Sequence, residues 1–226
     1  VRDGIQAVFL LVLARHSVET YGSIMLAMSL GQILLFCSEF GINQHFMLLL
    51  ANRTAAPSAV FRQISLLKAA LLMAGGVFMT VFSIWQGYSA ELLAVVLIIG
   101  LSFGVDALVN SYYVVCQSLG RQDMEARLRG VSAIVCYGAG LLAVFSGASP
   151  IMTALFKPIE SMTSLAGAAK MLRRSWKAAT APLWSAIWTT WKGTFPFTLM
   201  ALAAILYNKI NMFFLQHYGG AQAVAQ

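Results

Sequence analysis

Charged residues and cysteines are scarce in this sequence. Charged side chains make up 10% of the 226 residues and hydrophobic ones 59%, whereas a soluble domain usually has about 25% charged residues. This composition excludes a soluble domain with a single anchor and indicates a membrane protein with several spans. Cys37, Cys116 and Cys136 are scattered through apolar segments without CxxC spacing. They argue against disulfides or a zinc site and favour small buried residues.

Motifs for nucleotide, metal and hydrolytic chemistry are also missing. There is no P-loop or GxGxxG, and His16, His45 and His217 are isolated from one another in sequence. The connections at 86–91 and 146–150 are only a few residues long. They leave no room for an acid–base or nucleophilic site with a substrate pocket. We therefore expect a protein that is not an enzyme and that uses neither a cofactor nor a metal ion.

Long apolar runs fill most of the chain, and they lack the alternation that strands would show. The prediction is an all-α, polytopic membrane helix bundle of about seven transmembrane helices, in which one six-helix lobe is followed by the first helix of a second lobe. The six spans of the first lobe are expected at 5–16, 23–50, 64–88, 91–117, 130–147 and 150–172, with a polar connector at 14–22.

The expected organisation has three parts. Residues 1–169 form an N-terminal lobe, 170–192 a cytoplasmic linker and 193–226 the first helix of a C-terminal lobe. The segments VFLLVLARHSVETYG and MFFLQHYGGAQAVAQ both run from an apolar helix through a short polar turn to small residues. This echo indicates two related lobes, a common transporter plan, and we expect the chain to be a piece of a longer protein.

Basic residues are distributed unevenly among the connections. They gather after the second, fourth and sixth spans, as in the group Arg121, Arg127 and Arg129, whereas the other connections hold only Arg15. Because basic loops stay in the cytoplasm, the N-terminus is predicted to be cytoplasmic. The net charge of +7 then reflects topology and anionic lipid rather than binding of nucleic acid.

The linker combines basic and aromatic residues. Trp184, Trp188 and Trp191 recur at four- and three-residue steps and share a helix face. The basic residues that we expect to contact the anionic leaflet are Lys170, Arg173, Arg174 and Lys177. This pattern favours an interfacial amphipathic helix over a calmodulin-like target, which would show similar chemistry.

The apolar stretch from Phe195 to Gly220 carries a lysine in its interior. Lys209 is flanked by Asn208 and Asn211 on one broad arc of a helix, and a lysine at mid-membrane costs roughly 3 kcal/mol. Either the ammonium snorkels towards the helix end, or it lines a wet cavity and meets an anionic substrate. We favour the cavity, because lipid would reject the whole arc.

The fourth span also carries a polar stripe. Ser102, Asp106, Asn110, Tyr113 and Gln117 follow one another at steps of three or four and lie on one helix face. Such a stripe either makes hydrogen bonds between helices or lines an aqueous path. A carboxylate at its centre favours the path, with Asp106 as an ion site or as the counter-ion of a buried lysine.

Several other polar residues lie inside or at the ends of spans. Lys157 and Glu160 can pair on one helix face, and Pro158 between them should kink that helix. Glu39 and Gly41 suggest a locally broken helix, or simple capping at a bend.

Two further cations lie near the ends of spans. Arg15 is expected at the outer mouth of the first span, where an anion or a lipid headgroup would be its partner. Lys68 is expected near a cytoplasmic helix end, where it snorkels into water.

Four segments resemble the polysaccharide and O-antigen flippases of the multidrug/oligosaccharidyl-lipid/polysaccharide exporter superfamily. LARHSVETYG at 13–22 is similar to LxRxLGPxxYG after the first helix of that family, and Glu39–Ile42 to an acidic element in its second helix. Leu206–Asn211 resembles the Tyr, polar, Arg or Lys, Ile, Asp pattern of its seventh helix, with Asn211 in place of Asp. GGAQAVAQ at 219–226 is similar to the turn before its eighth helix.

The resemblance implies a flippase that moves undecaprenyl-diphosphate-linked oligosaccharide across the bacterial inner membrane by alternating access, alongside polymerase and export proteins. A diphosphate needs cations in a wet cavity. The expected anion contacts are Lys209, Arg15 and Lys157; the expected coupling or cavity residues are Asp106, Glu39, Asn110, Asn208 and Asn211. The alternatives are a cation-coupled multidrug or metabolite antiporter of the same superfamily, whose cavity carboxylates should outnumber cations, and a membrane-embedded glycan polymerase or transferase, which needs a large outward loop.

Overall fold

The computed structural model describes residues 2–39, 41–52, 57–172, 188, 190–200 and 203. Over these residues the chain is all α-helical, as the sequence predicts, and no strand is found in them. The helices are α1 (Arg2–His16), α2 (Val18–Glu39), α3 (Ile42–Ala51), α4 (Pro57–Trp85), α5 (Ala90–Ser118), α6 (Gln122–Phe145), α7 (Pro150–Ala154) and α8 (Phe156–Leu172). Residues 190–200 form a further helical segment.

Four stretches in the described part of the chain are long and apolar enough to cross a membrane. They are Val18–Ala51, Ser58–Trp85, Ala90–Ser118 and Gln122–Phe145. The 29 residues of α5 extend about 43 Å at the helical rise, more than the ~30 Å hydrocarbon core of a bilayer. These helices indicate a membrane protein with several spans.

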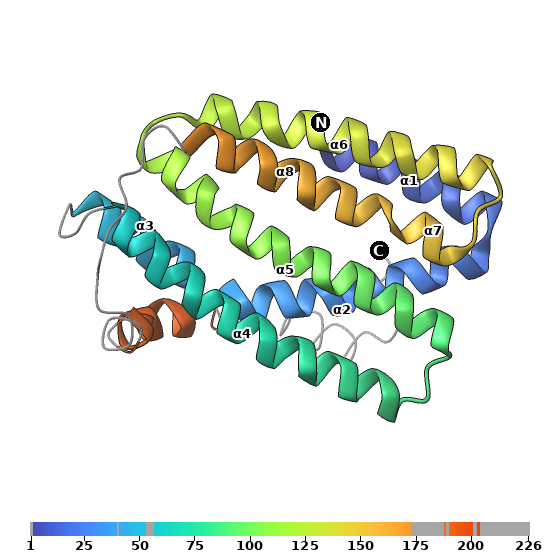
Figure 1. Cartoon of the computed structure of the whole chain (residues 1–226), viewed down its shortest axis with the longest axis horizontal. Coiled ribbons are helices and arrows are strands. Elements are labelled where there is room, and N and C mark those ends of the chain that lie inside the picture. Colours follow the sequence, from blue (N-terminus) through green and yellow to red (C-terminus); the bar gives the residue numbers. More distant parts are fainter. Residues whose placement is uncertain are drawn as a thin grey trace, which may run out of the picture.

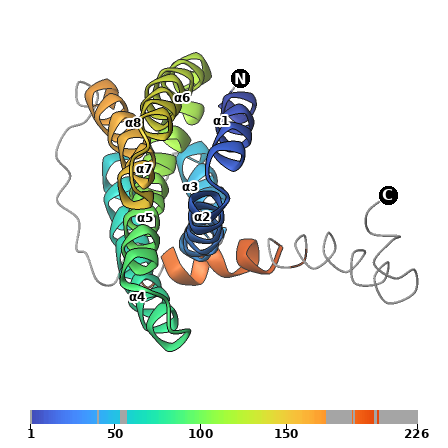
Figure 2. The same cartoon turned by 90° about the vertical axis from the view of Figure 1, so that its right-hand side faces the viewer.

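Helix α5 is the centre of the bundle. It packs against α2, α3 and α4 on one side and against α7 and α8 on the other. Helix α6 packs against α8, and α1 packs against α6 and α2, as Figures 1 and 2 show. Phe9, Tyr137 and Phe156 join α1, α6 and α8, with ring centroids 4.8 to 5.9 Å apart. This arrangement places the middle of α5 between two layers of helices.

Short turns that share a Gly-x-Ser pattern join α4 to α5 and α6 to α7. Gly87 and Gly147 adopt left-handed backbone angles, with φ of 70° and 68°, which residues with a Cβ rarely adopt. Two residues later, Ser89 and Ser149 accept hydrogen bonds from the backbone N–H groups of the next helix. These local signals explain why neighbouring helices run antiparallel with few residues between them.

The structure corrects the expected ends of two segments. The polar connector at 14–22 is nearly all helical, because only Ser17 separates α1 from α2, and its hydroxyl accepts the Thr20 N–H at 3.2 Å. Helix α6 begins at Gln122 rather than at residue 130. Polar residues can continue a helix beyond its apolar part, so hydropathy alone predicts helices that are too short at these ends.

The segment expected as one span at 150–172 consists of two helices, α7 and α8. The expected kink is a break at Leu155, just before Pro158. Proline has no N–H to donate and its ring crowds the carbonyl four residues earlier, which here belongs to Ala154 at the end of α7. The break directs the first turn of α8 towards the centre of the bundle.

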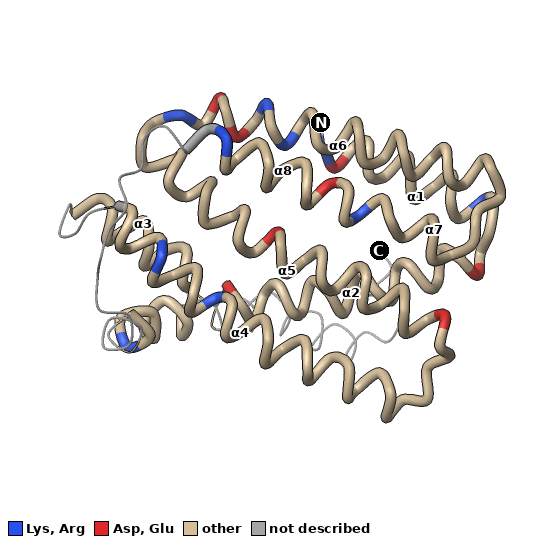
Figure 3. Tube along the Cα trace, viewed as in Figure 1, with Lys and Arg blue, Asp and Glu red and all other residues tan. Residues whose placement is uncertain are grey.

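Most charged positions lie near helix ends, but a few lie halfway along the bundle. Figure 3 shows acidic and basic positions close together in the middle of α5 and α8, and a second such pair where α2 and α4 approach each other. The outward faces instead carry large apolar side chains, including Phe78, Trp85 and Leu101, which are at least 72% exposed. The interior charges therefore mark the candidate site.

Candidate functional site

Several sequence-predicted residues lie outside the described residues, and the structure makes no statement about them. They are Lys209, Asn208 and Asn211 of the predicted seventh span and Arg173, Arg174 and Lys177 of the predicted linker. Within the linker, Trp188 and Trp191 are described and are exposed, while Lys170 lies exposed in the last turn of α8.

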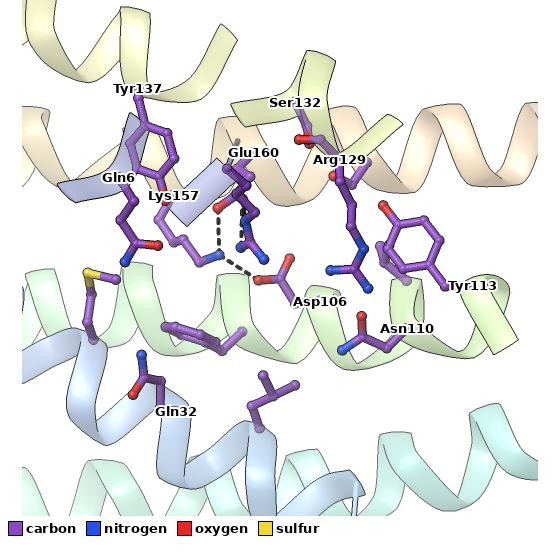
Figure 4. Close-up of a pocket in the computed structure, with 16 residues that line it drawn as sticks. Gln6, Gln32, Asp106, Asn110, Tyr113, Arg129, Ser132, Tyr137, Lys157 and Glu160 are labelled. Atoms are coloured by element: carbon purple, nitrogen blue, oxygen red, sulfur yellow. Dashed lines mark hydrogen bonds and ion pairs between the residues drawn. The ribbon is translucent and has the colours of Figure 1, made fainter. Parts of the chain in front are cut away.

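A polar cavity of about 230 Å³ lies between α1, α2, α5, α6 and α8. Figure 4 shows its lining, in which polar and charged side chains from different helices point towards one another. Its polar members are Arg2, Gln6, Gln32, Asp106, Asn110, Tyr113, Arg129, Ser132, Tyr137, Lys157, Glu160 and Ser164. A polar cavity of this size inside a helix bundle has room for water or for part of a ligand.

Lys157 is the central cation of the cavity wall. Its Nζ lies 2.6 Å from Asp106 Oδ2 and 2.7 Å from Glu160 Oε2, and its side chain is 2% exposed. The predicted pairing of Lys157 with Glu160 is confirmed, and the lysine also supplies the buried counter-ion that the sequence suggested for Asp106. The ammonium also lies 4.6 Å from the centre of the Phe103 ring.

Two further side chains complete this ion-pair network. Arg2 Nη2 lies 2.7 Å from Glu160 Oε1, and the hydroxyl of Ser161 donates to Asp106 Oδ1 at 2.7 Å. Two cations and two carboxylates from α1, α5 and α8 therefore balance one another at short range. Such a network tolerates burial because every charge has a partner.

Arg129 is a cavity residue that sequence reasoning missed. The sequence pattern indicates only a basic residue in a cytoplasmic connection at this position, because the fifth span is expected to begin at residue 130. In the structure Arg129 lies inside α6, its Nε donates to Glu125 Oε1 at 2.9 Å, and its guanidinium stacks 4.3 Å from the Tyr113 ring centre. Extending the helix back through the polar residues before 130 would have placed it on the inner face.

The polar stripe of α5 divides into two groups. Asp106, Asn110 and Tyr113 line the cavity. Ser102 instead donates to the backbone oxygen of Ile98, and Gln117 donates to Glu125. The aqueous-path interpretation therefore fits the middle of the stripe. The interhelical hydrogen-bond interpretation fits Gln117, whose partner lies on α6, but not Ser102, whose bond stays within α5.

A second polar cluster surrounds Lys68 at the break between α2 and α3. The Lys68 side chain is 0% exposed, so the prediction that it snorkels into water is wrong. Residues of α2, α3 and α5 close over this position on α4, and their oxygens satisfy the ammonium. Nζ donates to Asn43 Oδ1 at 2.7 Å and to the Ala107 carbonyl at 2.8 Å, while Glu39 Oε1 lies 3.8 Å away.

The predicted helix break beside Glu39 is confirmed. Helix α2 ends at Glu39 and α3 begins at Ile42, with Gly41 between them at a φ of 69°. Glu39 accepts hydrogen bonds from Asn110 at 2.8 Å and Asn43 at 3.1 Å. Asn110 therefore connects this cluster to the cavity, which it also lines.

Arg15 lies away from both clusters. It is exposed in the last turn of α1 and is not among the residues that line the cavity. Of the three expected anion contacts, only Lys157 reaches the cavity among the described residues. Within the same residues, no three His, Cys, Asp or Glu side chains are placed to hold a metal ion. Comparisons of the chain with known protein families, curated proteins and solved structures gave no match.

Proposed function

We propose that the chain is part of a transporter that flips lipid-linked oligosaccharide, carried on undecaprenyl diphosphate, across the bacterial inner membrane. The observation that carries the proposal is the polar cavity between the helices, whose described lining contains three cations, Arg2, Arg129 and Lys157, and two carboxylates, Asp106 and Glu160. The lining itself therefore presents more positive than negative charge to the cavity, while Glu125 pairs with Arg129 from outside the lining. A surface of this kind suits an anionic cargo. The sequence resemblance to polysaccharide flippases supplies the class of cargo.

The three cations have different freedom to meet a ligand. Lys157 is enclosed by its two carboxylates, whereas the side chains of Arg2 and Arg129 are 34% and 37% exposed. Arginine can present two parallel N–H donors to phosphate oxygens. Because Glu125 binds Arg129 through Nε, the far edge of the guanidinium can face the cavity, where Figure 4 shows it next to Asp106 and Asn110. Arg129 is therefore our first candidate for contact with the diphosphate.

In this proposal residues 1–169 supply one wall of the translocation path, and a second lobe supplies the other. Rocking of the two lobes exposes the cavity alternately to the cytoplasm, where the N-terminus lies, and to the outer leaflet. Asp106 and Glu39 are the candidate groups for coupling to an ion gradient. Lys209 remains a proposed anion contact of the second lobe, and a polysaccharide polymerase is the proposed downstream partner.

The excess of cations in the lining also favours a flippase over a cation-coupled antiporter. A cation-coupled antiporter should present more carboxylates than cations to its substrate, and the described cavity lining has the opposite balance. A glycan polymerase or transferase should hold acid and base residues in a sizeable loop. The described connections between α4 and α5 and between α6 and α7 are too short for such a site.

The test replaces Arg129 by alanine in the intact protein. Export of surface glycan, in a strain that depends on this protein, should fall at least about tenfold, the effect of losing 1.4 kcal/mol of charge-assisted binding. Arg127→Ala is the matched control, because Arg127 lies on the same helix and is exposed. Membrane levels of both variants are measured by immunoblot. Unchanged export in Arg129→Ala at normal protein level would contradict the proposal.

A further inference from the structure

The cluster around Lys68 occupies the end of a broken helix. Helix α2 stops at Glu39, and the left-handed Gly41 redirects the chain into α3. The last carbonyls of a helix lack partners within it and carry partial negative charge. In a membrane protein, a buried end of this kind is a favourable place for a cation.

The Lys68 ammonium is held mainly by uncharged oxygens. The amide oxygen of Asn43 lies 2.7 Å from Nζ and the backbone oxygen of Ala107 lies 2.8 Å from it. The nearest carboxylate oxygen, on Glu39, is 3.8 Å away and accepts hydrogen bonds from Asn43 and Asn110. The positive charge therefore lies in a cage of carbonyl oxygens, and the carboxylate balances it from one step further out.

This arrangement differs from an ordinary ion pair and matches the chemistry of a bound cation. Carboxylate, amide and backbone carbonyl oxygens are the ligands that hard cations select. Here they come from three helices, α2, α3 and α5, and they surround a group that enters from a fourth, α4. We propose that the Lys68 ammonium is a built-in monovalent cation, which takes the position that a sodium ion would otherwise occupy at the α2–α3 break.

The built-in cation fixes the geometry of the break without an ion from solution. It ties α4 to α3 and α5 at the level of Gly41. The helical segment at 190–200 packs closely on the same break, because a Cβ added at Gly41 would lie 2.6 Å from backbone atoms of Phe197 and Thr198. Loss of the cation should therefore loosen both α3 and the docking of this segment.

The first experiment removes the ammonium and supplies free cations in its place. The intact Lys68→Ala protein is purified in detergent, and its apparent melting temperature is measured in choline chloride. We expect a fall of about 10 °C, because the carboxylate and carbonyl oxygens lose their cation. Sodium chloride or propylammonium chloride at equal ionic strength should restore at least half of this loss. The neutral analogue 1-propanol should not.

Wild-type protein and Lys170→Ala, which removes an exposed lysine on α8, are the controls and should show no preference for sodium over choline. The proposal is overturned if sodium has no effect on Lys68→Ala, or if 1-propanol restores stability as well as propylammonium does. In either case Lys68 would fill space rather than a cation site. The measurement involves no transport, so its outcome is separate from that of the proposed flippase function.

If Lys68→Ala does not fold, the proposal is tested by comparing Lys68→Met with the double variant that also carries Glu39→Gln. Lys68→Met keeps most of the side-chain volume but leaves Glu39 without its cation. Adding Glu39→Gln removes the unbalanced charge, so the double variant should melt at a higher temperature than Lys68→Met alone. A double variant that is less stable by the sum of the two single losses would overturn the proposal.

Discussion

Two lysines are buried beside α5, and their surroundings differ. Lys157 enters from α8 and touches two carboxylates at 2.6 and 2.7 Å, one of which, Asp106, is 17% exposed beside the cavity. Lys68 enters from α4 and touches two neutral oxygens, with its carboxylate at 3.8 Å. The first site balances charge by direct pairing. The second holds the ammonium with neutral oxygens, and the Glu39 carboxylate balances its charge from 3.8 Å away. The same residue type is thus part of an ion-pair network beside a cavity in one place and a cation held mainly by neutral oxygens in the other.

The difference follows from where each lysine meets a helix irregularity. Lys157 lies just after the break at Leu155, in the first turn of α8, where its side chain can turn into the cavity. Lys68 lies in the interior of the unbroken α4, and the break belongs to its neighbours α2 and α3. An irregularity in the lysine's own helix turns its side chain into the cavity wall, whereas an irregularity in the helices around it supplies oxygens.

The largest expected effect is the loss of Lys157. Lys157→Met leaves Asp106 without its cation and Glu160 with Arg2 alone, and breaking a buried pair in this way costs about 3–5 kcal/mol. Lys68→Met leaves one carboxylate that was 3.8 Å away, so its cost should be smaller. Chemical denaturation of the two intact variants under identical conditions compares them.

The control for this comparison is Lys157→Met combined with Asp106→Asn. Asp106 is the carboxylate that Lys157→Met leaves without a cation, because Glu160 keeps Arg2 at 2.7 Å. Neutralising Asp106 should therefore recover part of the lost stability, since the two residues are coupled through a direct contact. If Lys157→Met is no less stable than Lys68→Met, direct pairing and caging hold the two ammonium groups equally well, and the distinction between the sites fails.

Local sequence spacing predicted what is close along the chain. The pair Lys157–Glu160, the helix break beside Gly41 and the shared face of Asp106, Asn110 and Tyr113 depend only on helical geometry. The all-α fold followed from long apolar runs. Helix ends were less well predicted, because a serine cap after α1 and the polar first turns of α6 do not appear in hydropathy.

Contacts between residues that are far apart in the sequence could not be predicted from it. Asp106 meets Lys157 across 51 residues, Glu39 meets Asn110 across 71 and Arg2 meets Glu160 across 158. Lys68 looked like a snorkelling residue because nothing near it along the chain offers a partner, although three helices provide them in the fold. Charge in an apolar run predicts that partners exist, but helix packing decides which ones.

A smaller effect is expected from Gly41→Ala, which tests whether the break is required. The alanine must adopt a φ of 69° and place its Cβ 2.6 Å from the backbone of residues 197 and 198, so we expect a loss of at least about 2 kcal/mol. Gly22→Ala, in the preceding helix α2, is the control, because a Cβ there meets nothing within 4 Å. Equal unfolding midpoints for the two variants would show that the α2–α3 break does not depend on glycine.

The smallest expected effect is that of Arg15→Ala. The sequence made Arg15 an anion contact, but its side chain is exposed at the end of α1 and is not part of the cavity lining. Removing an exposed charge of this kind usually changes stability by less than about 0.5 kcal/mol. Glycan export should therefore stay within about twofold of wild type, which corresponds to that free energy. In Arg129→Ala, by contrast, export should fall at least about tenfold. An equal loss of export in Arg15→Ala and Arg129→Ala would place the anion path along the C-terminal end of α1. The path would then lie away from both buried lysines.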